Sequence, residues 1–183
     1  LYAWCEELKF QYKDLLLEST IDFSLINQLV SDSTGDKNNI SGFCAFGFLL
    51  RYVNDSNFYS VLISDGGYFR MDVMFNGNQI PLIGWTLIPV SQNSDKNIIN
   101  LKIIANSTNF CIIINDKTCC NIEDDTIQSE GYVAFAGQNW QMHEKVCAKL
   151  KYLKIDRRDI FIDSSYRQWS HIDEITPEQN LAN

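Results

Sequence analysis

The sequence predicts an all-β protein, built as a sandwich of two antiparallel sheets. Apolar residues recur at every second position over residues 46–76, and similar short segments recur along the chain between turn signals. No segment carries a convincing helical period of apolar residues. About ten strands of this kind bury their apolar sides by packing two sheets face to face.

Composition limits the number of domains and the classes of partner. The 183 residues, of which 45% are hydrophobic and 13% aromatic, suffice for one domain with its own core and tails. A formal net charge of -8 argues against nucleic acid and against anionic membranes as partners. No run approaches the ~20 apolar residues of a membrane span, and the opening LYAWCEELKF lacks the order of a leader peptide. We therefore expect a soluble domain without direct membrane insertion.

The N-terminal half provides the first group of strands. Residues 1–14 form a lead-in for which an irregular segment, an edge strand and a short helix all remain open. Residues 15–26 alternate as a long strand, and the polar segment 31–41 ends it as a loop. Further strands are expected near residues 43–53, 58–64, 68–75 and, as a short one, 79–83.

Turn residues separate these strands. Asn54-Asp55-Ser56-Asn57, Asp65-Gly66-Gly67 and Asn76-Gly77-Asn78 are turn signals, and Asn-Gly is among the strongest hairpin signals known. Trp85 to Lys96 has Pro81 and Pro89 nearby and ends in a polar stretch. We expect this segment to be a surface crossover rather than the interior of a strand.

The second half provides five more strands before the pattern stops. They are expected at residues 98–106, 110–114, 117–122, 131–136 and 145–155. Beyond Asp156, Thr176-Pro177-Glu178 has the N-cap, the proline and the acidic first turn that open a helix. We infer that the chain was cut from a longer polypeptide, with residues 1–14 as a lead-in, 15–156 as the domain and 157–183 as a tail or linker.

Six cysteines leave the thiol state open. They are Cys5, Cys44, Cys111, Cys119, Cys120 and Cys147. No C-x-x-C spacing occurs and the chain has only two histidines, so a structural zinc site is not expected. Disulfides remain an alternative, including Cys111 with Cys120 across a predicted hairpin. We favour free, mostly buried thiols, because cysteine packs well as a small apolar residue.

Four sequence phrases carry a family resemblance. They are GFLLRYVNDSNFYSVLISDGGYFRMDV, Gly84-Trp85-Thr86, NIINLKIIANSTNFCIIINDK and EGYVAFAG. Over roughly residues 15–156 the chain resembles the concanavalin A-like lectin/glucanase superfamily, and more narrowly the laminin G-like modules of bacterial surface and secreted proteins. The resemblance implies a jelly roll with two curved antiparallel sheets. It also implies that sugars or proteins bind on the concave sheet or at the loops of its rim.

The chain departs from the catalytic members of that superfamily. Those related to bacterial laminarinases carry paired carboxylates as E-x-D-x-x-E on one strand. The densest acidic run here is Glu123-Asp124-Asp125, and adjacent strand residues point to opposite faces. We therefore name no catalytic residue. His143 and His171 have no matched cysteine or serine at a spacing that suggests a catalytic triad.

The best candidate binding surface follows from the alternation itself. The core face is expected to hold Tyr59, Val61, Ile63, Phe69, Met71 and Val73. The opposite face then carries Ser60, Leu62, Ser64, Tyr68, Arg70 and Asp72, and we place Arg51 with them. From this set we select Arg51, Ser60, Tyr68, Arg70 and Asp72 as candidate ligand residues. Arginine supplies forked donors for sugar hydroxyls or a carboxylate; the alternative is a solvated face whose arginines pair with Asp72.

Two tryptophans are candidate rim aromatics. Trp85 follows the short strand, and Trp140 lies in the loop after Gly137. An exposed indole offers a flat apolar platform to a sugar ring or anchors a protein interface. Packing over an open edge of the sandwich is the alternative, and the one we favour.

No cofactor or metal site is assigned. Calcium is a frequent structural ion in the superfamily, and oxygen ligands for it are available from Asn54, Asn57, Asp55 and Asp65. Turn chemistry explains the same residues without an ion, because Asn and Asp bond their own backbone at bends.

The sequence favours a non-catalytic binding or interaction module of a larger secreted, periplasmic or surface-attached protein, with carbohydrate or protein as its ligand. The alternatives are a glycoside-processing enzyme of the same superfamily and a structural spacer domain. The sequence does not identify the ligand, the compartment, the neighbouring domains or the oligomeric state.

Overall fold

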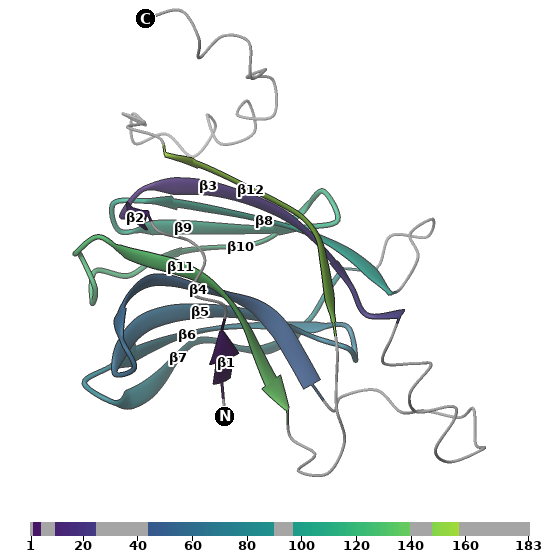
Figure 1. Cartoon of the computed structure of the whole chain (residues 1–183), viewed down its shortest axis with the longest axis horizontal. Coiled ribbons are helices and arrows are strands. Elements are labelled where there is room, and N and C mark those ends of the chain that lie inside the picture. Colours follow the sequence, from purple (N-terminus) through teal and green to yellow (C-terminus); the bar gives the residue numbers. More distant parts are fainter. Residues whose placement is uncertain (1, 5–9, 25–43, 90–96, 140–147, 158–183) are drawn as a thin grey trace, which may run out of the picture.

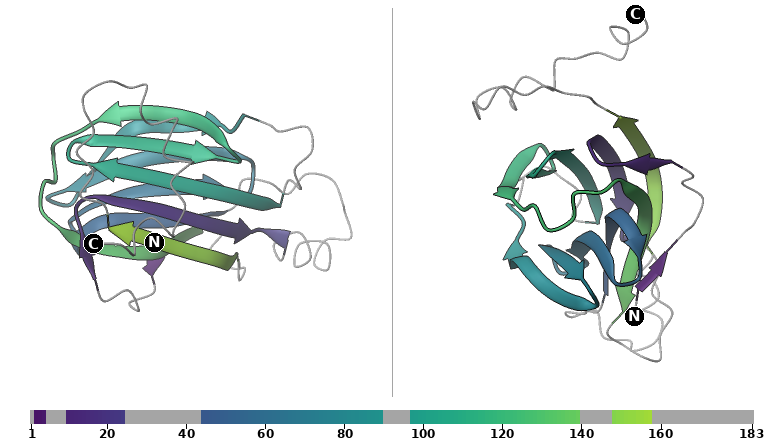
Figure 2. Two further views of the ribbon diagram at one scale, coloured as in Figure 1. Left: turned by 90° about the horizontal axis from the view of Figure 1, so that it is seen from above. Right: turned by 90° about the vertical axis from the view of Figure 1, so that its left-hand side faces the viewer.

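The structure, a computed structural model, describes residues 2–4, 10–24, 44–89, 97–139 and 148–157. Within these residues the chain forms two antiparallel sheets and no helix. Figure 1 shows the two sheets lying face to face, and Figure 2 shows the same sandwich from above and from one end. No described segment is a helix of the length and apolarity that a membrane crossing requires.

The front sheet, lower in Figure 1, contains seven strands in the order β1-β11-β4-β5-β6-β7, with β2 also paired to β11. Its strands are β1 (Tyr2–Trp4), β2 (Gln11–Tyr12), β4 (Cys44–Asn54), β5 (Asn57–Ser64), β6 (Tyr68–Phe75), β7 (Asn78–Leu87) and β11 (Gly131–Asn139). These strands bow toward the other sheet, so the outer face of the front sheet is concave (Figure 1).

The back sheet contains five strands in the order β10-β9-β8-β3-β12. Its strands are β3 (Leu15–Asp22), β8 (Ile98–Asn106), β9 (Asn109–Ile114), β10 (Lys117–Glu123) and β12 (Lys149–Arg157). The pairing of β3 with β12 joins residues near the two ends of the described chain. The predicted fold class, a two-sheet antiparallel jelly roll, is confirmed.

The alternation over residues 46–76 is confirmed by the register of β5 and β6. Across these strands Tyr59 pairs with Val73, Val61 with Met71 and Ile63 with Phe69. All six side chains are buried in the core, which is completed from the back sheet by residues that include Leu17, Ile103, Phe110 and Ile112. The intervening pairs, Ser60 with Asp72 and Leu62 with Arg70, share the outer face.

The surface crossover predicted from Trp85 onward is wrong over residues 85–87. Strand β7 continues to Leu87, and its ladder with β6 is interrupted by two register shifts. Pro81 is tolerated because β7 is the last strand in the sheet order, where a missing N–H need not remove a ladder bond. Residues 90–96 of the predicted crossover lie outside the described residues.

Of the three alternatives for residues 1–14, the structure shows strands at residues 2–4 and 11–12, and residues 1 and 5–9 lie outside the described residues. Residues 2–4 pair with the far end of β11, and residues 11–12 pair with its beginning. The predicted loop at 31–41, the first residues of the strand predicted at 145–155, the helix start at Thr176 and residues 158–183 lie outside the described residues.

Four cysteines lie in the described residues, and the structure gives all four as thiols. Cys44 and Cys111 are buried, and Cys119 and Cys120 are half-buried. The hairpin pairs Cys111 with Asn121 and Cys120 with Ile112, so Cys111 and Cys120 are not directly opposed. Burial raises the pKa of the Cys120 thiol to about 12, which keeps it protonated at neutral pH. The thiol state that we favoured is thus confirmed for these four; Cys5 and Cys147 lie outside the described residues.

Candidate functional site

The concave outer face of the front sheet has a floor of small side chains. Along β11, β4 and β5 the register places these residues on one face: Ala134, Ala136, Ala45, Gly47, Ser60 and Ser64. Leu49 and Phe58 lie beside them in a second, smaller apolar cluster. All six of these floor residues are buried, so the accessible surface on this face comes from its margins.

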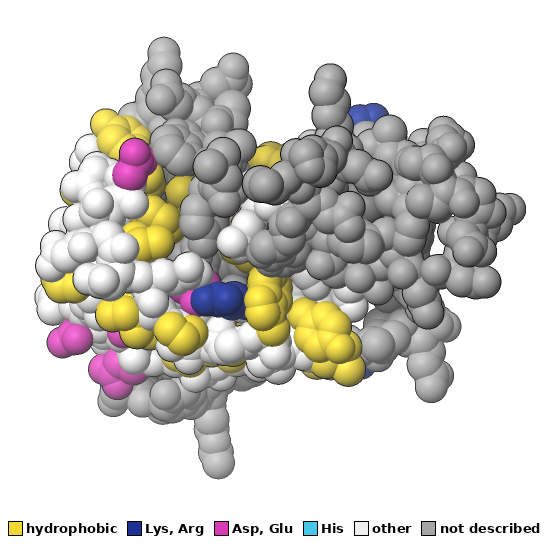
Figure 3. All heavy atoms as spheres, turned by 90° about the horizontal axis from the view of Figure 1, so that it is seen from below, with side chains coloured by type: hydrophobic (Ala, Val, Ile, Leu, Met, Phe, Trp, Pro, Cys, Tyr) yellow, Lys and Arg dark blue, Asp and Glu magenta, His cyan; other side chains and the backbone are white. Residues whose placement is uncertain are grey.

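The accessible margin lies at β6 and β7. Tyr68 is 43% exposed, Trp85 36% and Leu87 58%. Tyr68 pairs with Leu87 across the two strands, and the indole of Trp85 lies beside Arg70. Figure 3 views the outer face and shows a basic side chain beside an acidic one, with apolar side chains around them. We call Tyr68, Arg70, Asp72, Trp85 and Leu87 the β6–β7 patch.

A forked ion pair fixes the polar part of the β6–β7 patch. Arg70 Nε donates to both carboxylate oxygens of Asp72, at 2.8 and 2.6 Å, and Arg70 Nη2 donates to Oδ1 at 2.6 Å. The two residues are two apart on β6 and therefore point to the same face. The Asp72 side chain is only 2% exposed, whereas that of Arg70 is 24% exposed. The carboxylate thus acts as a buried anchor that orients a guanidinium still reachable from solvent.

The indole of Trp85 lies against the same guanidinium. The central carbon of the Arg70 guanidinium lies 5.8 Å from the centroid of the Trp85 ring. A cation at this distance is attracted to the ring face. The fork and the ring contact together hold a polar donor group beside an exposed flat apolar surface.

The predicted ligand residues are distributed unevenly over this face. Tyr68 and Arg70 are accessible on the β6–β7 patch, as expected from the alternation of β6, and Trp85, which was expected in a crossover, is accessible beside them on β7. Ser60 and Asp72 share the outer face but are each 1% exposed, so the structure leaves them no direct surface for a ligand. Asp72 instead acts through Arg70, and Trp140 lies outside the described residues. Leu87 was missed because its segment was expected to be a crossover.

Arg51 is the clear correction, because it does not lie on the outer face. Its side chain is fully buried on the inner side of the front sheet. The guanidinium lies 4.9 Å from the ring centroid of Phe110, a core residue of the back sheet, and 5.7 Å from that of Tyr59. Arg51 and Arg70 are therefore on opposite sides of their sheet.

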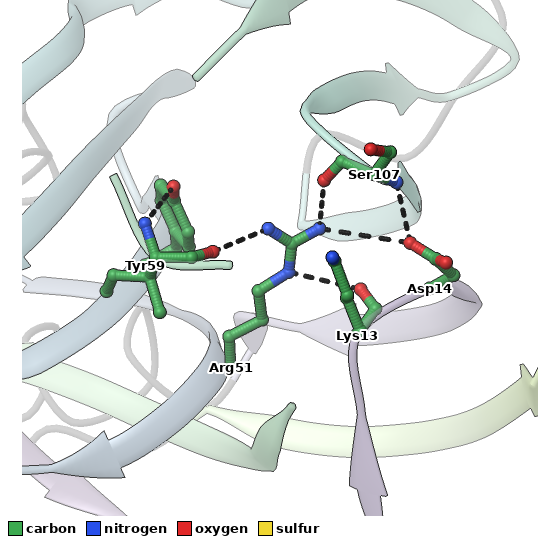
Figure 4. A network of polar contacts seen from close by, with 6 residues as sticks. Lys13, Asp14, Arg51, Tyr59 and Ser107 are labelled. Atoms are coloured by element: carbon green, nitrogen blue, oxygen red, sulfur yellow. Dashed lines mark hydrogen bonds and ion pairs between the residues drawn. The ribbon is translucent and has the colours of Figure 1, made fainter. Parts of the chain in front are cut away.

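The Arg51 guanidinium joins three chain segments that are distant in sequence. Nε donates to the carbonyl of Lys13 at 3.1 Å, Nη1 to that of Ile127 at 2.7 Å, and Nη2 to that of Ser107 (Figure 4). The Asp14 carboxylate lies 4.0 Å from Nη2 and also accepts the Ser107 backbone N–H at 2.6 Å. Burial lowers the pKa of Arg51, and the nearby Tyr59, Asp14 and Asp124 oppose that shift. Arg51 is thus a structural clamp at one end of the sandwich.

A β-bulge explains why alternation misplaced Arg51. The register between β4 and β11 shifts between Leu49 and Tyr52, where β4 has one residue more than β11, and Arg51 has a left-handed φ of 47°. An extra residue in one strand reverses the alternation beyond it, so the side chain turns inward. Gly131 on the neighbouring strand permits the bulge, since a Cβ there would lie 2.3 Å from the carbonyl carbon of Arg51.

The oxygen-rich turns have their own hydrogen bonds. Asn54 Oδ1 accepts the Ser56 backbone N–H at 2.9 Å and the Asn57 side-chain amide at 3.0 Å. Asn57 Oδ1 accepts the backbone N–H of Asn76 at 3.2 Å, and Asp55 accepts the Tyr52 hydroxyl. Among the described residues, no group of three or more His, Cys, Asp or Glu side chains is placed to hold a metal ion.

The acidic run Glu123-Asp124-Asp125, which begins at the last residue of β10, contributes to the interior. Asp124 Oδ1 accepts the hydroxyl of the buried Tyr59 at 2.6 Å and the backbone N–H of Thr126 at 3.0 Å. Glu123 accepts the Thr108 hydroxyl at 3.0 Å. Burial, followed by the hydrogen bond to Asp124, raises the pKa of Tyr59. These contacts stabilise the sandwich end and do not form a carboxylate pair on the concave face.

Comparison with solved structures agrees with the two-sheet sandwich fold. The carbohydrate-binding module CBM66 from Bacillus subtilis superposes with a TM-score of 0.58 at 16% identity, over 85% of this chain and 92% of that one. A β-glucanase from Bacillus licheniformis gives 0.54 at 9% identity, over 82% and 69%. The galectin LEC-6 from Caenorhabditis elegans gives 0.51 at 11% identity, over 86% and 90%. The chain therefore has the concanavalin A-like jelly-roll fold.

One sequence relative is a much longer protein. A TPR repeat-containing protein from Treponema pallidum (strain Nichols) is 30% identical over 200 aligned residues, which cover 90% of this chain. The chain spans 24% of the length of that relative. No family model matches the chain.

Proposed function

We propose that this chain is a carbohydrate-binding module whose ligand contacts the β6–β7 patch. The observation that carries the proposal is the exposed Trp85 ring beside an Arg70 guanidinium held by a buried carboxylate. A sugar ring presents an apolar face of C–H groups and a rim of hydroxyl groups. An exposed indole covers the former, and oriented guanidinium N–H groups bind the latter.

The shape of the face supports the same ligand class. A concave sheet with an apolar margin and a few fixed polar groups is the usual form of a small-ligand site. The structurally similar proteins include one named as a carbohydrate-binding module and one named as a galectin. Their fold, together with the β6–β7 patch of this chain, favours carbohydrate over a protein partner.

The module is one part of a longer protein at the cell surface, in the periplasm or outside the cell. The T. pallidum relative supports the proposal that the module belongs to a longer protein, because the chain spans only 24% of a protein named for its TPR repeats. The proposed ligand class, carbohydrate, supports the proposed location. Surface labelling of intact source cells tests the location, and labelling confined to lysed cells would contradict it.

A glycan array tests the proposed ligand class. The 183-residue chain is applied to an array of plant, microbial and animal glycans, and the strongest hit is then measured by calorimetry. Trp85→Ala should weaken that affinity at least about tenfold, because the aromatic anchor of the β6–β7 patch is lost. Arg70→Lys keeps a positive charge beside Asp72 but loses the forked donors, so it should also weaken binding.

A matched control uses another exposed aromatic. Tyr152 on β12 of the back sheet is 49% exposed, and Tyr152→Ala should leave the affinity unchanged. An empty array, or a Trp85→Ala variant that binds like the parent chain, would overturn the proposal.

A further inference from the structure

The distribution of basic residues over the two sheets is uneven. Among the described strands, those of the front sheet carry two basic residues, Arg51 and Arg70. The back sheet carries the other basic residues of described strands, namely Lys102, Lys117, Lys149, Lys151, Lys154 and Arg157. Within the described strands, the charge on the concave face therefore depends on where those two arginines point.

Neither arginine gives the concave face a net positive charge. Arg51 points into the sandwich, where it binds three carbonyl oxygens. Arg70 is on the outer face, but both oxygens of Asp72 accept its N–H groups at 2.6–2.8 Å. Asp72 is the one acidic residue on the described strands of the front sheet. The outer face of those strands thus carries one positive and one negative charge in direct contact.

This balance decides between two classes of glycan. A uronate, sulfate or sialate group needs a cation that is not already neutralised, and it would approach a chain of net charge -8. A neutral sugar needs only N–H donors and an apolar ring surface, which Arg70 and Trp85 supply. We infer that the β6–β7 patch selects neutral glycans over the anionic forms of the same glycans. This inference rests on the proposed carbohydrate-binding function.

Matched glycan pairs test the inference on the unaltered chain. Each neutral oligosaccharide on the array is paired with its sulfated, sialylated or uronic form, and both are measured by calorimetry. The neutral form should bind at least about tenfold more tightly, because the anionic form gains no uncompensated cation. The affinity of the chain for the neutral form should change less than about twofold between low and high salt, since no net charge is neutralised on binding.

A substitution at Asp72 tests the cause. Asp72→Asn keeps the size of the side chain and removes the carboxylate that compensates Arg70. The ratio of the affinity for the neutral form to the affinity for the anionic form should then fall by about tenfold or more. Asp65→Asn, in the turn between β5 and β6, also removes one negative charge and should leave the preference unchanged.

The outcomes separate this inference from the proposed function. Equal or tighter binding of the anionic forms, or a steep fall of affinity with salt, overturns the inference and leaves carbohydrate binding intact. An array on which neither form binds overturns both. If Asp72→Asn does not fold, the matched pairs and the salt dependence of the unaltered chain still decide the question.

Discussion

Arg51 and Arg70 lie on the same sheet, separated by strand β5, yet they perform opposite tasks. Arg51 is fully buried and uses its donors on the carbonyls of Lys13, Ile127 and Ser107. Arg70 is 24% exposed and uses its fork on one carboxylate beside an exposed indole. The comparison shows that residue type alone does not mark a binding site. What matters is whether the donors join segments of the fold or remain at an accessible surface.

The largest expected effect comes from removing the buried arginine. Arg51→Met should lower the free energy of unfolding by about 3–5 kcal/mol, because a buried guanidinium is removed and the carbonyls of Lys13, Ser107 and Ile127 lose their donor at once. Chemical denaturation measures the change. The control is Arg157→Met, which breaks an exposed pair with Glu130 and should cost less than about 1 kcal/mol. Equal losses for the two variants would refute the clamp role of Arg51.

A glycine pair tests the bulge that turns Arg51 inward. Gly131→Ala would place a Cβ 2.3 Å from the Arg51 carbonyl carbon and 2.7 Å from its oxygen. Backbone must then shift, and we expect a loss of about 1–3 kcal/mol in the free energy of unfolding. Gly84→Ala on β7 meets no atom within 4 Å, so its effect should stay within about 0.5 kcal/mol. Similar denaturation midpoints for the two variants would contradict the close approach at Gly131.

The buried Tyr59 hydroxyl should make the free energy of unfolding depend on pH in the alkaline range. Its pKa is raised in the folded chain, chiefly by burial, whereas in the unfolded chain it ionises near pH 10. Above about pH 10 the unfolded state therefore binds fewer protons, and stability falls as pH rises, by up to roughly 1.4 kcal/mol per pH unit. Below that pH the contribution is fully present.

Tyr59→Phe isolates this contribution. At neutral pH it should cost about 1–2 kcal/mol, since Asp124 and the Ile127 N–H lose their shared partner. Its unfolding free energy should then fall less steeply above about pH 10 than that of the parent chain. Parallel curves for the two proteins over that range would show that another group is responsible.

The smallest effect on stability is expected at the outer face. Trp85→Ala should change the free energy of unfolding by less than about 1 kcal/mol, because Trp85 is an exposed residue, at 36%, on an edge strand. Thermal and chemical denaturation measure this directly. A loss as large as that of Arg51→Met would make Trp85 a packing residue and weaken its role in binding.

Much of the fold could be predicted from local patterns. Period-two alternation placed Tyr59, Val61 and Ile63 on the core side, and the structure confirms each of them. The same pattern placed Tyr68 and Arg70 on the outer face, where the registers of β6 with β5 and with β7 put them. These predictions succeeded because a strand without bulges exposes successive side chains on opposite faces.

The errors occurred where the backbone leaves that rule. A bulge with a left-handed residue turned Arg51 inward, and register shifts in β7 carried the strand past Pro81 to Trp85 and Leu87. Bulges depend on the partner strand as much as on the local sequence, as the requirement for glycine at position 131 shows. The contact of Arg70 with Trp85 likewise joins two strands whose register the sequence did not specify.

The sequence by itself determined the fold class, the alternating strands and the faces of their side chains, because these follow from local backbone geometry and turn chemistry. It also determined the acidic net charge and the supply of candidate aromatic and basic residues. Only the tertiary structure decided which arginine is a clamp and which borders an open surface. That choice depends on a bulge, a strand register and contacts between segments up to 76 residues apart, which no local pattern encodes.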